Sequence, residues 1–397
     1  MKIIPEKAKR IHGLMVENEL AVLCRLAWGS QSIVELGCFK GKSLAAMGLS
    51  NKDAVLYGVD FFGDMSHRNY KGSTLEETKT NLEAAGVSAK FYVGKTDEVV
   101  EDFEHTVDML HIDAGHSYDE CMNDLKNWAP KVNKGGVVCI HDYGMPHKEI
   151  LERPEVMQAV DDWRNSEFEE IELDGTMIAF RNIIAEEGIL FVAYGDKAKD
   201  QVLENIKNLR KITPLPIAII SDNIFESADH TVLHKEIDAG ARTQKTRIYS
   251  LSPFRKTLFL DADTEVRMDP SFGFKLLDKV DLVIGQDVNR RLFGINWPNL
   301  NQIELKQTKS DIGVDVMYFN TGVMFFTRSE RNRKLFQTWN REWEKFGLQD
   351  QLAFIRALNK CPVRISIMRD RFNTHHEKNV TFVYHKHRTV SRVGAPK

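Results

Sequence analysis

Short apolar segments alternate with amphipathic helical patterns along almost the whole chain, and this alternation restricts the possible folds more than any other feature. In the first half, the segments expected to form strands are 32–36, 55–60, 90–93, 109–112 and 136–140. The alternation restarts after Glu186-Glu187-Gly188, with further strands expected at 189–194, 217–221, 257–260, 282–285 and 323–326. Strands that alternate with helices are typical of a mostly parallel sheet with helices on both faces. The sequence therefore predicts an α/β protein.

The length of the chain predicts two domains. A single hydrophobic core stops growing at roughly 250–300 residues, and the chain has 397. We place the boundary near residue 186, which gives domains at 1–185 and 186–397. Just before it, Asp174-Gly175 is a strong two-residue hairpin signal between expected strands at 168–173 and 176–180. The first domain is therefore expected to end in an antiparallel hairpin that closes its parallel sheet.

The composition is that of an ordinary globular protein. Hydrophobic residues make up 42% of the chain, charged residues 28%, and the net charge is -3, which argues against a dedicated nucleic-acid or anionic-membrane surface. No segment approaches the ~20 apolar residues of a membrane span, and no signal-peptide pattern is visible, so a cytoplasmic protein is expected. The cysteines lack C-x-x-C spacing, which favours reduced thiols over disulfides or zinc ligands.

The segment 33–43 has the pattern of a nucleoside-cofactor site: a strand, a turn with two glycines, and the start of a helix. Gly37 and Gly41 let the backbone bend tightly and let a ligand approach, while the helix N-terminus offers N–H groups. The next strand ends in Asp60, where an acidic residue accepts hydrogen bonds from a ribose diol. Because no third glycine follows in G-x-G-x-x-G spacing, a dinucleotide is not the expected ligand.

With the segments 108–118 and 134–143, this half resembles class I S-adenosylmethionine-dependent methyltransferases, in particular their small-molecule and sugar O-methyltransferases. The resemblance covers most of residues 30–182. It implies a Rossmann-like fold with a terminal antiparallel hairpin, and S-adenosylmethionine as cofactor.

The resemblance also implies roles for individual residues. In that family the glycine turn lies against the methionine part of the cofactor, the acidic residue that ends the second strand holds the ribose, and the later motif supplies metal and proton-transfer groups. By position these roles fall on Gly37, Gly41, Asp60, Asp113, His116 and Asp142. We add Glu35, which precedes the turn, and Asp97, which follows the third strand, to the cofactor-binding residues.

The chemistry of methylation agrees with these roles. An aliphatic hydroxyl becomes a nucleophile with help from a general base or from a divalent metal. His116 is the natural base, and Asp113 and Asp142 follow adjacent expected strands, so together they could hold Mg²⁺. Many relatives carry a second acidic residue where this chain has Ala114-Gly115, so the metal dependence of this half stays open.

In the second half, the apolar strand 257–260 runs into Asp261-Ala262-Asp263. Side chains alternate along a strand, so the two carboxylates lie on one side of its end. Mg²⁺ and Mn²⁺ are usually held by one or two carboxylates together with substrate phosphates. An isolated Asp-x-Asp is also a common way to begin a turn, so its interpretation depends on neighbouring motifs.

Two neighbouring segments favour a nucleotide site. The strand 189–194 ends in a turn where a nucleobase and ribose could dock, near Tyr194 and Asp196. A basic helix is expected over 241–249, with Arg242 and Lys245 on one face. These cations either neutralise a diphosphate leaving group or form an ordinary solvated face.

With the segments 318–326, 348–352, 371–373 and 383–387, the second half resembles GTA-type glycosyltransferases, nearest to the family-8-like nucleotide-sugar enzymes. The order and spacing of the motifs match over residues 188–390. The resemblance implies that Mn²⁺ or Mg²⁺ binds the Asp-x-Asp and a C-terminal histidine, and that other motifs line the donor-sugar and acceptor pocket. By position the metal ligands are Asp261, Asp263 and His385, with His387 as a competitor of His385, and the pocket residues are Asn320, Asp350 and Gln351.

The sequence thus predicts a bifunctional enzyme. It would transfer a sugar from a nucleotide-sugar donor and methylate a hydroxyl, plausibly on one glycan or small glycoside. One alternative is a glycosyltransferase whose first half binds cofactor or partner without turnover. Another is a non-enzymatic nucleotide-binding scaffold.

Overall fold

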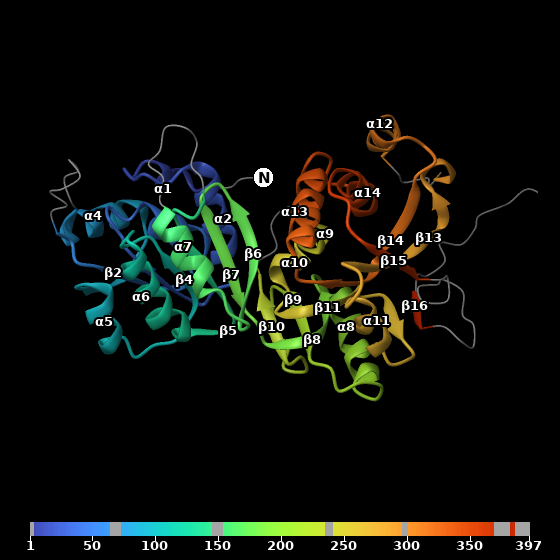
Figure 1. The fold of residues 1–397 in the computed structure, drawn as a ribbon, viewed down its shortest axis with the longest axis horizontal. Helices are drawn as coiled ribbons and strands as arrows, with labels where there is room; N and C mark the ends of the chain where they lie inside the picture. Colours follow the sequence, from blue (N-terminus) through green and yellow to red (C-terminus); the bar gives the residue numbers. More distant parts are fainter. Residues whose placement is uncertain are drawn as a thin grey trace, which may run out of the picture. The chain divides into compact units, whose positions relative to one another are not determined.

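The computed structural model describes residues 4–63, 73–144, 154–234, 241–295, 301–368 and 382–385. It divides into two compact units, the first comprising residues 1–184 with 233–235, and the second residues 185–232 with 236–397 (Figure 1). Each unit has its own central sheet and its own hydrophobic cores. Among the helices that the structure describes, none combines the length and apolar character needed to cross a membrane.

The sheet of the first unit has the strand order β3-β2-β1-β4-β5-β7-β6 within the described residues. Its strands are β1 (Ser32–Leu36), β2 (Val55–Asp60), β3 (Lys90–Val93), β4 (Val107–Ile112), β5 (Val132–Ile140), β6 (Phe168–Asp174) and β7 (Met177–Asn182). Strands β1 to β5 are parallel, whereas β7 lies antiparallel between β5 and β6. The α/β architecture and the terminal hairpin expected from the sequence are therefore confirmed.

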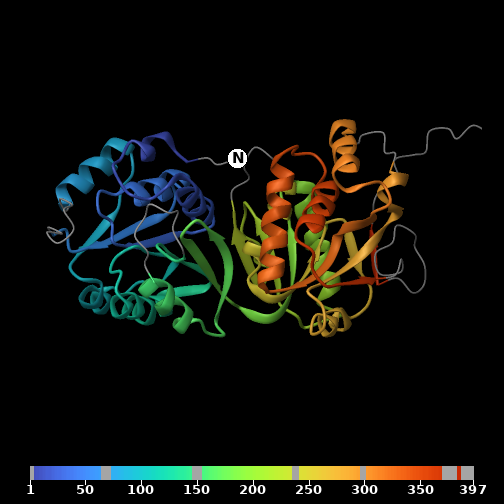
Figure 2. The same ribbon diagram turned by 45° about the horizontal axis from the view of Figure 1, so that its top comes forward.

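Helices cover both faces of this sheet (Figure 2). One face carries α1 (Glu6–Lys9), α2 (Glu17–Ala27), α3 (Lys42–Ser50) and α4 (Leu75–Ala85). The other carries α5 (Thr96–Asp102), α6 (Tyr118–Trp128) and α7 (Pro154–Trp163), with a short 3-10 turn at Ala129–Lys131. Successive residues of β1 point to opposite faces, Ile33 to the first core and Val34 to the second. Burial on both faces explains why the central strands are mostly apolar, apart from the paired Glu35 and His111.

The second unit has a mixed sheet with the order β10-β9-β8-β11-β14-β13-β15 within the described residues. Its strands are β8 (Ala185–Val192), β9 (Ile217–Ser221), β10 (His230–Leu233), β11 (Phe254–Leu260), β13 (Leu282–Arg291), β14 (Met317–Thr327) and β15 (Ile365–Met368). Strand β8 is parallel to β9 and β11, while β14 is antiparallel to β11 and β13. A separate antiparallel pair joins β12 (Thr264–Val266) to β16 (Val383–His385).

The helices of the second unit are α8 (Asp196–Leu209), α9 (Ala241–Lys245), α10 (Ile248–Leu251), α11 (Ser271–Leu276), α12 (Gln302–Ile312), α13 (Glu330–Glu344) and α14 (Asp350–Lys360), with a 3-10 turn at Leu292–Gly294. The prediction of a single basic helix over 241–249 is wrong, because α9 ends at Lys245 and α10 begins at Ile248. At the break, the single O–H of Thr246 lies within hydrogen-bond distance of two acceptors, the Thr243 carbonyl at 2.8 Å and Asn340 Oδ1 at 2.9 Å, so side-chain bonding competes with a continuous helix.

Candidate active sites

The strand order of the first unit reverses direction between β1 and β4. From β1 the chain builds β2 and β3 on one side, and β4 and β5 follow on the other. In open α/β sheets, ligands bind in the crevice beyond the carboxyl ends of the strands at such a reversal. Gly37 follows β1, Asp113 follows β4 and Asp142 lies just beyond β5. The predicted methyltransferase residues therefore converge on one edge of the sheet.

The glycine turn after β1 passes very close to the end of β4. Gly37 has a φ of +83°, and a Cβ there would lie 2.1 Å from the backbone oxygen of Asp113. Gly41 has a φ of +84°, but its Cβ would meet only side-chain atoms of Thr78 and Leu82, at 3.2 Å and 3.3 Å. Both positions need left-handed backbone, which glycine adopts without steric cost. Gly37 is also required by the close approach of the two loops.

Asp60 fastens this turn. Its Oδ2 accepts hydrogen bonds from the backbone N–H of Cys38 at 2.8 Å and of Phe39 at 2.9 Å, and its Oδ1 accepts one from Phe62 N–H at 2.8 Å. A carboxylate offers about four lone-pair sites, so these three bonds leave room for a ribose hydroxyl. Asp97, by contrast, is exposed in the first turn of α5.

Glu35, which we expected at the cofactor, lies inside the sheet instead. It sits opposite His111 on neighbouring strands β1 and β4, and both side chains are 0% exposed. His111 Nδ1 lies 2.8 Å from Glu35 Oε1. Burial raises the pKa of Glu35, against the opposing effect of His111. Because strand side chains alternate, Glu35 points into the core on the same side of the sheet as Ile33.

A cluster of acidic and imidazole groups lies beyond β4 and β5. His116 Nε2 is 2.9 Å from Asp142 Oδ2 and 3.8 Å from Asp113 Oδ1. His141 Nδ1 is 3.2 Å from Asp113 Oδ1, and His141 Nε2 is 3.0 Å from Glu19 Oε2. Asp142 has a φ of 60°, a conformation uncommon for residues other than glycine that tends to occur at functional sites.

Contacts between carboxylates and imidazoles shift the pKa values of Asp113 and His141. Burial by itself would raise the pKa of Asp113, but His141 and His116 beside it lower that pKa far below its usual range. Burial likewise opposes the charged form of His141, yet Asp113 and Glu19 raise its pKa. Ligand atoms of Asp113, His141 and Asp142 lie within 4.8 Å of one another. The donor set, two carboxylates and an imidazole, is compatible with a divalent cation.

Sequence reasoning missed Glu19 and His141. Glu19 is 3% exposed on α2, and its Oε1 accepts hydrogen bonds from Thr176 N at 2.9 Å and Thr176 Oγ1 at 2.7 Å. It therefore ties α2 to the terminal hairpin and to His141. One signal was available: Glu19 shares the buried face of α2 with Val22, Leu23 and Leu26, at helical spacing.

The second unit also has a reversal of strand order, between β8 and β11. Asp261 follows β11, and Lys245 Nζ lies 2.9 Å from its Oδ1 and 3.0 Å from its Oδ2. The same ammonium lies 2.9 Å from Asp350 Oδ2, which also accepts a hydrogen bond from Thr321 Oγ1 at 2.7 Å. Burial raises the pKa of Asp261, and the neighbouring Lys245 opposes this effect. The structure thus brings three predicted residues, Asp261, Asp350 and Lys245, into contact around one ammonium group.

The other pocket residues lie near by. Gln351 accepts a hydrogen bond from the Tyr318 hydroxyl at 3.2 Å and donates to Asp287 Oδ2 at 3.3 Å. Asn320 Oδ1 accepts from the backbone N–H of Gly322 at 2.8 Å, so its side chain shapes β14 itself. Asp287 is 4% exposed and was not identified from the sequence.

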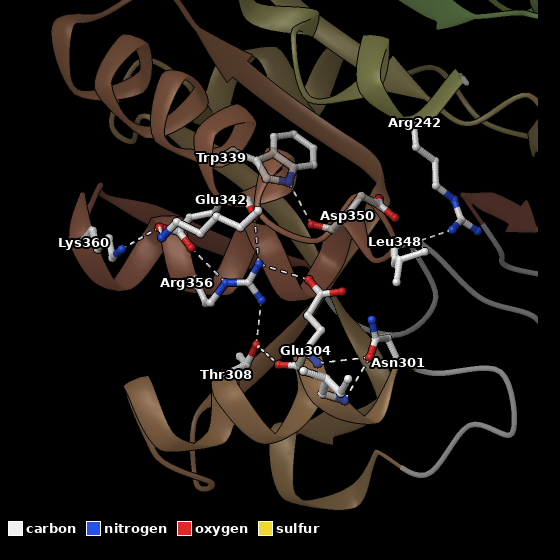
Figure 3. A network of polar contacts seen from close by, with 12 residues as sticks. Arg242, Asn301, Glu304, Thr308, Trp339, Glu342, Leu348, Asp350, Arg356 and Lys360 are labelled. Carbon is white, nitrogen blue, oxygen red and sulfur yellow. Dashed lines mark hydrogen bonds and ion pairs between the residues drawn. The ribbon is translucent and has the colours of Figure 1, made fainter. Parts of the chain in front are cut away.

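The predicted nucleotide-binding residues differ in environment. Tyr194 is buried in the core beyond β8, while Asp196 is exposed at the start of α8. Arg242 is exposed and donates to the Leu348 carbonyl at 2.7 Å (Figure 3). Lys245 is 9% exposed, so the two cations of α9 do not form the common solvent-facing surface that their spacing suggested.

Asp350 and Gln351 begin α14, and buried polar contacts hold this helix (Figure 3). Trp339 Nε1 donates to the Asp350 carbonyl at 2.8 Å. Farther along, the guanidinium of Arg356 lies 3.0 Å from Glu304 Oε1 on α12 and 3.0 Å from Glu342 Oε2 on α13. The position of Asp350 therefore depends on three packed helices.

The C-terminal histidines are only partly described. His385 is described by its backbone, which pairs with Thr264 immediately after the Asp-x-Asp segment. His387 and the segment 371–373 lie outside the described residues. The register of β16 brings this part of the chain beside Asp263, while the ligand role of His385 stays a prediction.

A family model matches part of the first unit. Residues 34–143 match a family model described as a methyltransferase domain. The uncharacterized protein R132 of Acanthamoeba polyphaga mimivirus is 28% identical over 128 residues, which is 32% of this chain and 56% of R132. The chain thus spans little more than half the length of that relative.

Solved structures with lower identity are also similar. An O-methyltransferase family protein from Burkholderia thailandensis is 14% identical with a TM-score of 0.31, covering 41% of this chain and 54% of its own. The O-methyltransferase TomG from Streptomyces achromogenes, solved in complex with SAM, is 17% identical with a TM-score of 0.32, covering 42% of this chain and 80% of its own. The family match includes the glycine turn, Asp60, His116 and Asp142, and supports a methyltransferase domain in the first unit.

Proposed function

We propose that the first unit transfers the methyl group of S-adenosylmethionine to a hydroxyl oxygen of a small molecule or glycan. The observation that carries this proposal is the contact of 2.9 Å between His116 Nε2 and Asp142 Oδ2, at the edge of the sheet that also bears the glycine turn. A histidine oriented by a carboxylate is an arrangement that supports general-base catalysis. The family match over residues 34–143 agrees with it.

The residues present fit this cofactor. Gly37 and Gly41 provide a turn in left-handed backbone, and Asp60 retains capacity for a ribose hydroxyl after fastening that turn. When bound, S-adenosylmethionine supplies an electrophilic methyl group. The chain then has to orient the acceptor hydroxyl and remove its proton as the new carbon–oxygen bond forms.

His116 is proposed to take that proton. Asp142 stabilises the positive charge that develops on the imidazole, and Asp113, 3.8 Å from His116 Nε2, adds to this field. Glu19 holds His141 from the opposite side and so keeps Asp113 in place. If a divalent cation takes part, Asp113, Asp142 and His141 would hold it, and it would acidify the acceptor hydroxyl. Transfer assays with and without a chelator distinguish the two routes.

The His116→Gln substitution is expected to lower kcat for methyl transfer by roughly 10²–10⁴-fold, because the general base is lost. The Kd for S-adenosylmethionine should stay within about twofold, since His116 serves the acceptor. Calorimetry with the cofactor, and transfer of labelled methyl groups to a panel of catechols, sugars and glycosides, measure the two quantities. His105→Gln, an exposed histidine outside the cluster, is the control. An unchanged kcat in His116→Gln contradicts the assigned role, and absence of cofactor binding by the native protein removes the methyltransferase proposal.

For the second unit we propose transfer of a sugar from a nucleoside diphosphate sugar. The contact of one ammonium, that of Lys245, with both Asp261 and Asp350 at the reversal of strand order favours this function. Cleavage of the bond between the sugar carbon and the diphosphate oxygen leaves negative charge on the diphosphate, which a divalent cation and nearby cations stabilise. Asp263 and His385 are proposed to complete the cation site with Asp261. A glycosidase would instead need two carboxylates flanking the sugar.

The Asp263→Ala substitution is expected to reduce donor turnover by at least roughly 10²-fold, because a cation ligand is removed. Nucleoside diphosphate release is measured with Mn²⁺ and a panel of nucleotide sugars, with Asp269→Ala as a control at an aspartate beyond the Asp-x-Asp segment. Equal turnover in Asp263→Ala and native protein would refute the glycosyltransferase proposal.

Because the two proposed activities are joined in one chain, the product of one site would be present at a higher effective concentration at the other site. Cofactor binding without methyl transfer to any acceptor would instead favour a first unit that only binds.

A further inference from the structure

Lys245 occupies an unexpected position for a residue assigned to a diphosphate. Its ammonium contacts both oxygens of Asp261, at 2.9 Å and 3.0 Å, and Asp350 Oδ2 at 2.9 Å. It also lies 5.7 Å from the ring centre of Phe259, and the residue is 9% exposed. The ammonium is therefore already used by two carboxylates of the site in which a cation is proposed to bind.

The partners of Lys245 also have contacts that do not involve Lys245. Asp261 follows β11, and its N–H donates to the Gly322 carbonyl at 2.8 Å. Asp350 is fixed through its side chain by Thr321 and through its carbonyl by Trp339. Lys245 reaches both across a flexible four-carbon side chain. When a ligand enters, the ammonium is the group that can move at least cost.

A divalent cation and this ammonium compete for Asp261. Direct coordination requires at least one Asp261 oxygen, and both oxygens contact the ammonium. Two positive charges brought to about 4 Å repel each other by several kcal/mol at the effective dielectric constant of a protein site. A diphosphate relieves this conflict, because it brings negative charge that can accept the displaced ammonium.

We propose that Lys245 is a built-in counter-cation that holds Asp261 and Asp350 together and is passed to the diphosphate when a divalent cation binds Asp261. This inference rests on the proposed nucleotide-sugar function of the second unit. Its consequence is that cation and nucleoside diphosphate bind cooperatively: each is weak alone, and each strengthens the other by the same factor. Lys245 then acts on cation affinity before any chemical step.

The proposal is tested by measuring Mn²⁺ binding to the full chain. Electron paramagnetic resonance gives the affinity with and without uridine or guanosine diphosphate. Asp263→Ala, which lacks a ligand of the second unit, gives the background from other sites. In native protein, the affinity of the Asp263-dependent site should rise roughly tenfold or more with nucleotide. In Lys245→Met, Mn²⁺ alone should bind roughly tenfold more tightly than in native protein, and the gain from nucleotide should be smaller than in native protein, where it includes both direct coordination by the diphosphate and the transfer of Lys245.

Control variants separate this effect from general damage. Lys256→Met removes a lysine from the opposite end of β11, where it pairs with Asp278, and should leave Mn²⁺ affinity unchanged. If Lys245→Met does not fold, Lys245→Gln removes the charge while keeping a hydrogen-bond donor, and the same tightening is expected. Nucleotide-dependent Mn²⁺ binding in native protein with no tightening in the Lys245 variants overturns this inference and leaves the proposed function standing. Absence of Asp263-dependent Mn²⁺ binding in every protein overturns both.

Discussion

The Gly37→Ala substitution is expected to abolish binding of S-adenosylmethionine and to destabilise the first unit by about 3 kcal/mol or more. A Cβ at this position would lie 2.1 Å from the oxygen and 2.6 Å from the carbonyl carbon of Asp113. These are backbone atoms, so either the glycine turn or the end of β4 has to move. The φ of +83° adds strain for any residue with a side chain.

Gly41→Ala is the matched control for this prediction. Its φ of +84° is almost the same, but the added Cβ would meet only side-chain atoms, at 3.2 Å or more. The expected loss is about 1–2 kcal/mol, from backbone strain alone. Hydrogen exchange in denaturant measures the free energy of unfolding of each unit separately, and calorimetry measures the affinity for S-adenosylmethionine. Equal losses of stability in Gly37→Ala and Gly41→Ala would show that the close approach of Gly37 to the Asp113 backbone does not contribute to the effect.

The Arg356→Met substitution is expected to destabilise the second unit by about 3–5 kcal/mol. Arg356 is 1% exposed and its guanidinium contacts Glu304 and Glu342, which are also buried (Figure 3). Glu342 keeps ion pairs with Lys345 and Lys360, whereas Glu304 loses its partner on α14. Removing one member of a buried ion pair leaves a charge without compensation, which costs more than the pair itself contributes.

Two further variants sharpen this test. Arg291→Met removes an exposed arginine that pairs with Asp315, and should cost less than about 1 kcal/mol. The double variant Arg356→Met with Glu304→Met should recover part of the loss, because the buried Glu304 carboxylate is removed together with its partner. Denaturant unfolding of the second unit gives each free energy. A loss in Arg356→Met no greater than that in Arg291→Met would contradict the prediction.

The strands and the positions of the predicted residues at strand ends could be anticipated from the sequence for a physical reason. Short, mostly apolar segments such as 33–36 and 257–260 are typical of strands that a sheet buries on both faces. Because parallel strands present their carboxyl ends at one edge, residues that follow them, such as Asp113 and Asp142, converge there. The α/β fold of both units and the hairpin at Asp174-Gly175 follow from the same local patterns.

The remaining features depend on contacts that no local pattern contains. The sequence by itself determined most strands of the two central sheets, the glycine turn and the approximate edge at which acidic residues gather, but not β10, β15 or the break between α9 and α10. Only the tertiary structure decided that Glu35 faces His111 in the core, that Glu19 reaches His141 from α2, and that Lys245 binds two carboxylates. Periodicity tells which face of its own element a residue occupies, whereas its partner is set by the packing of elements far apart in the chain.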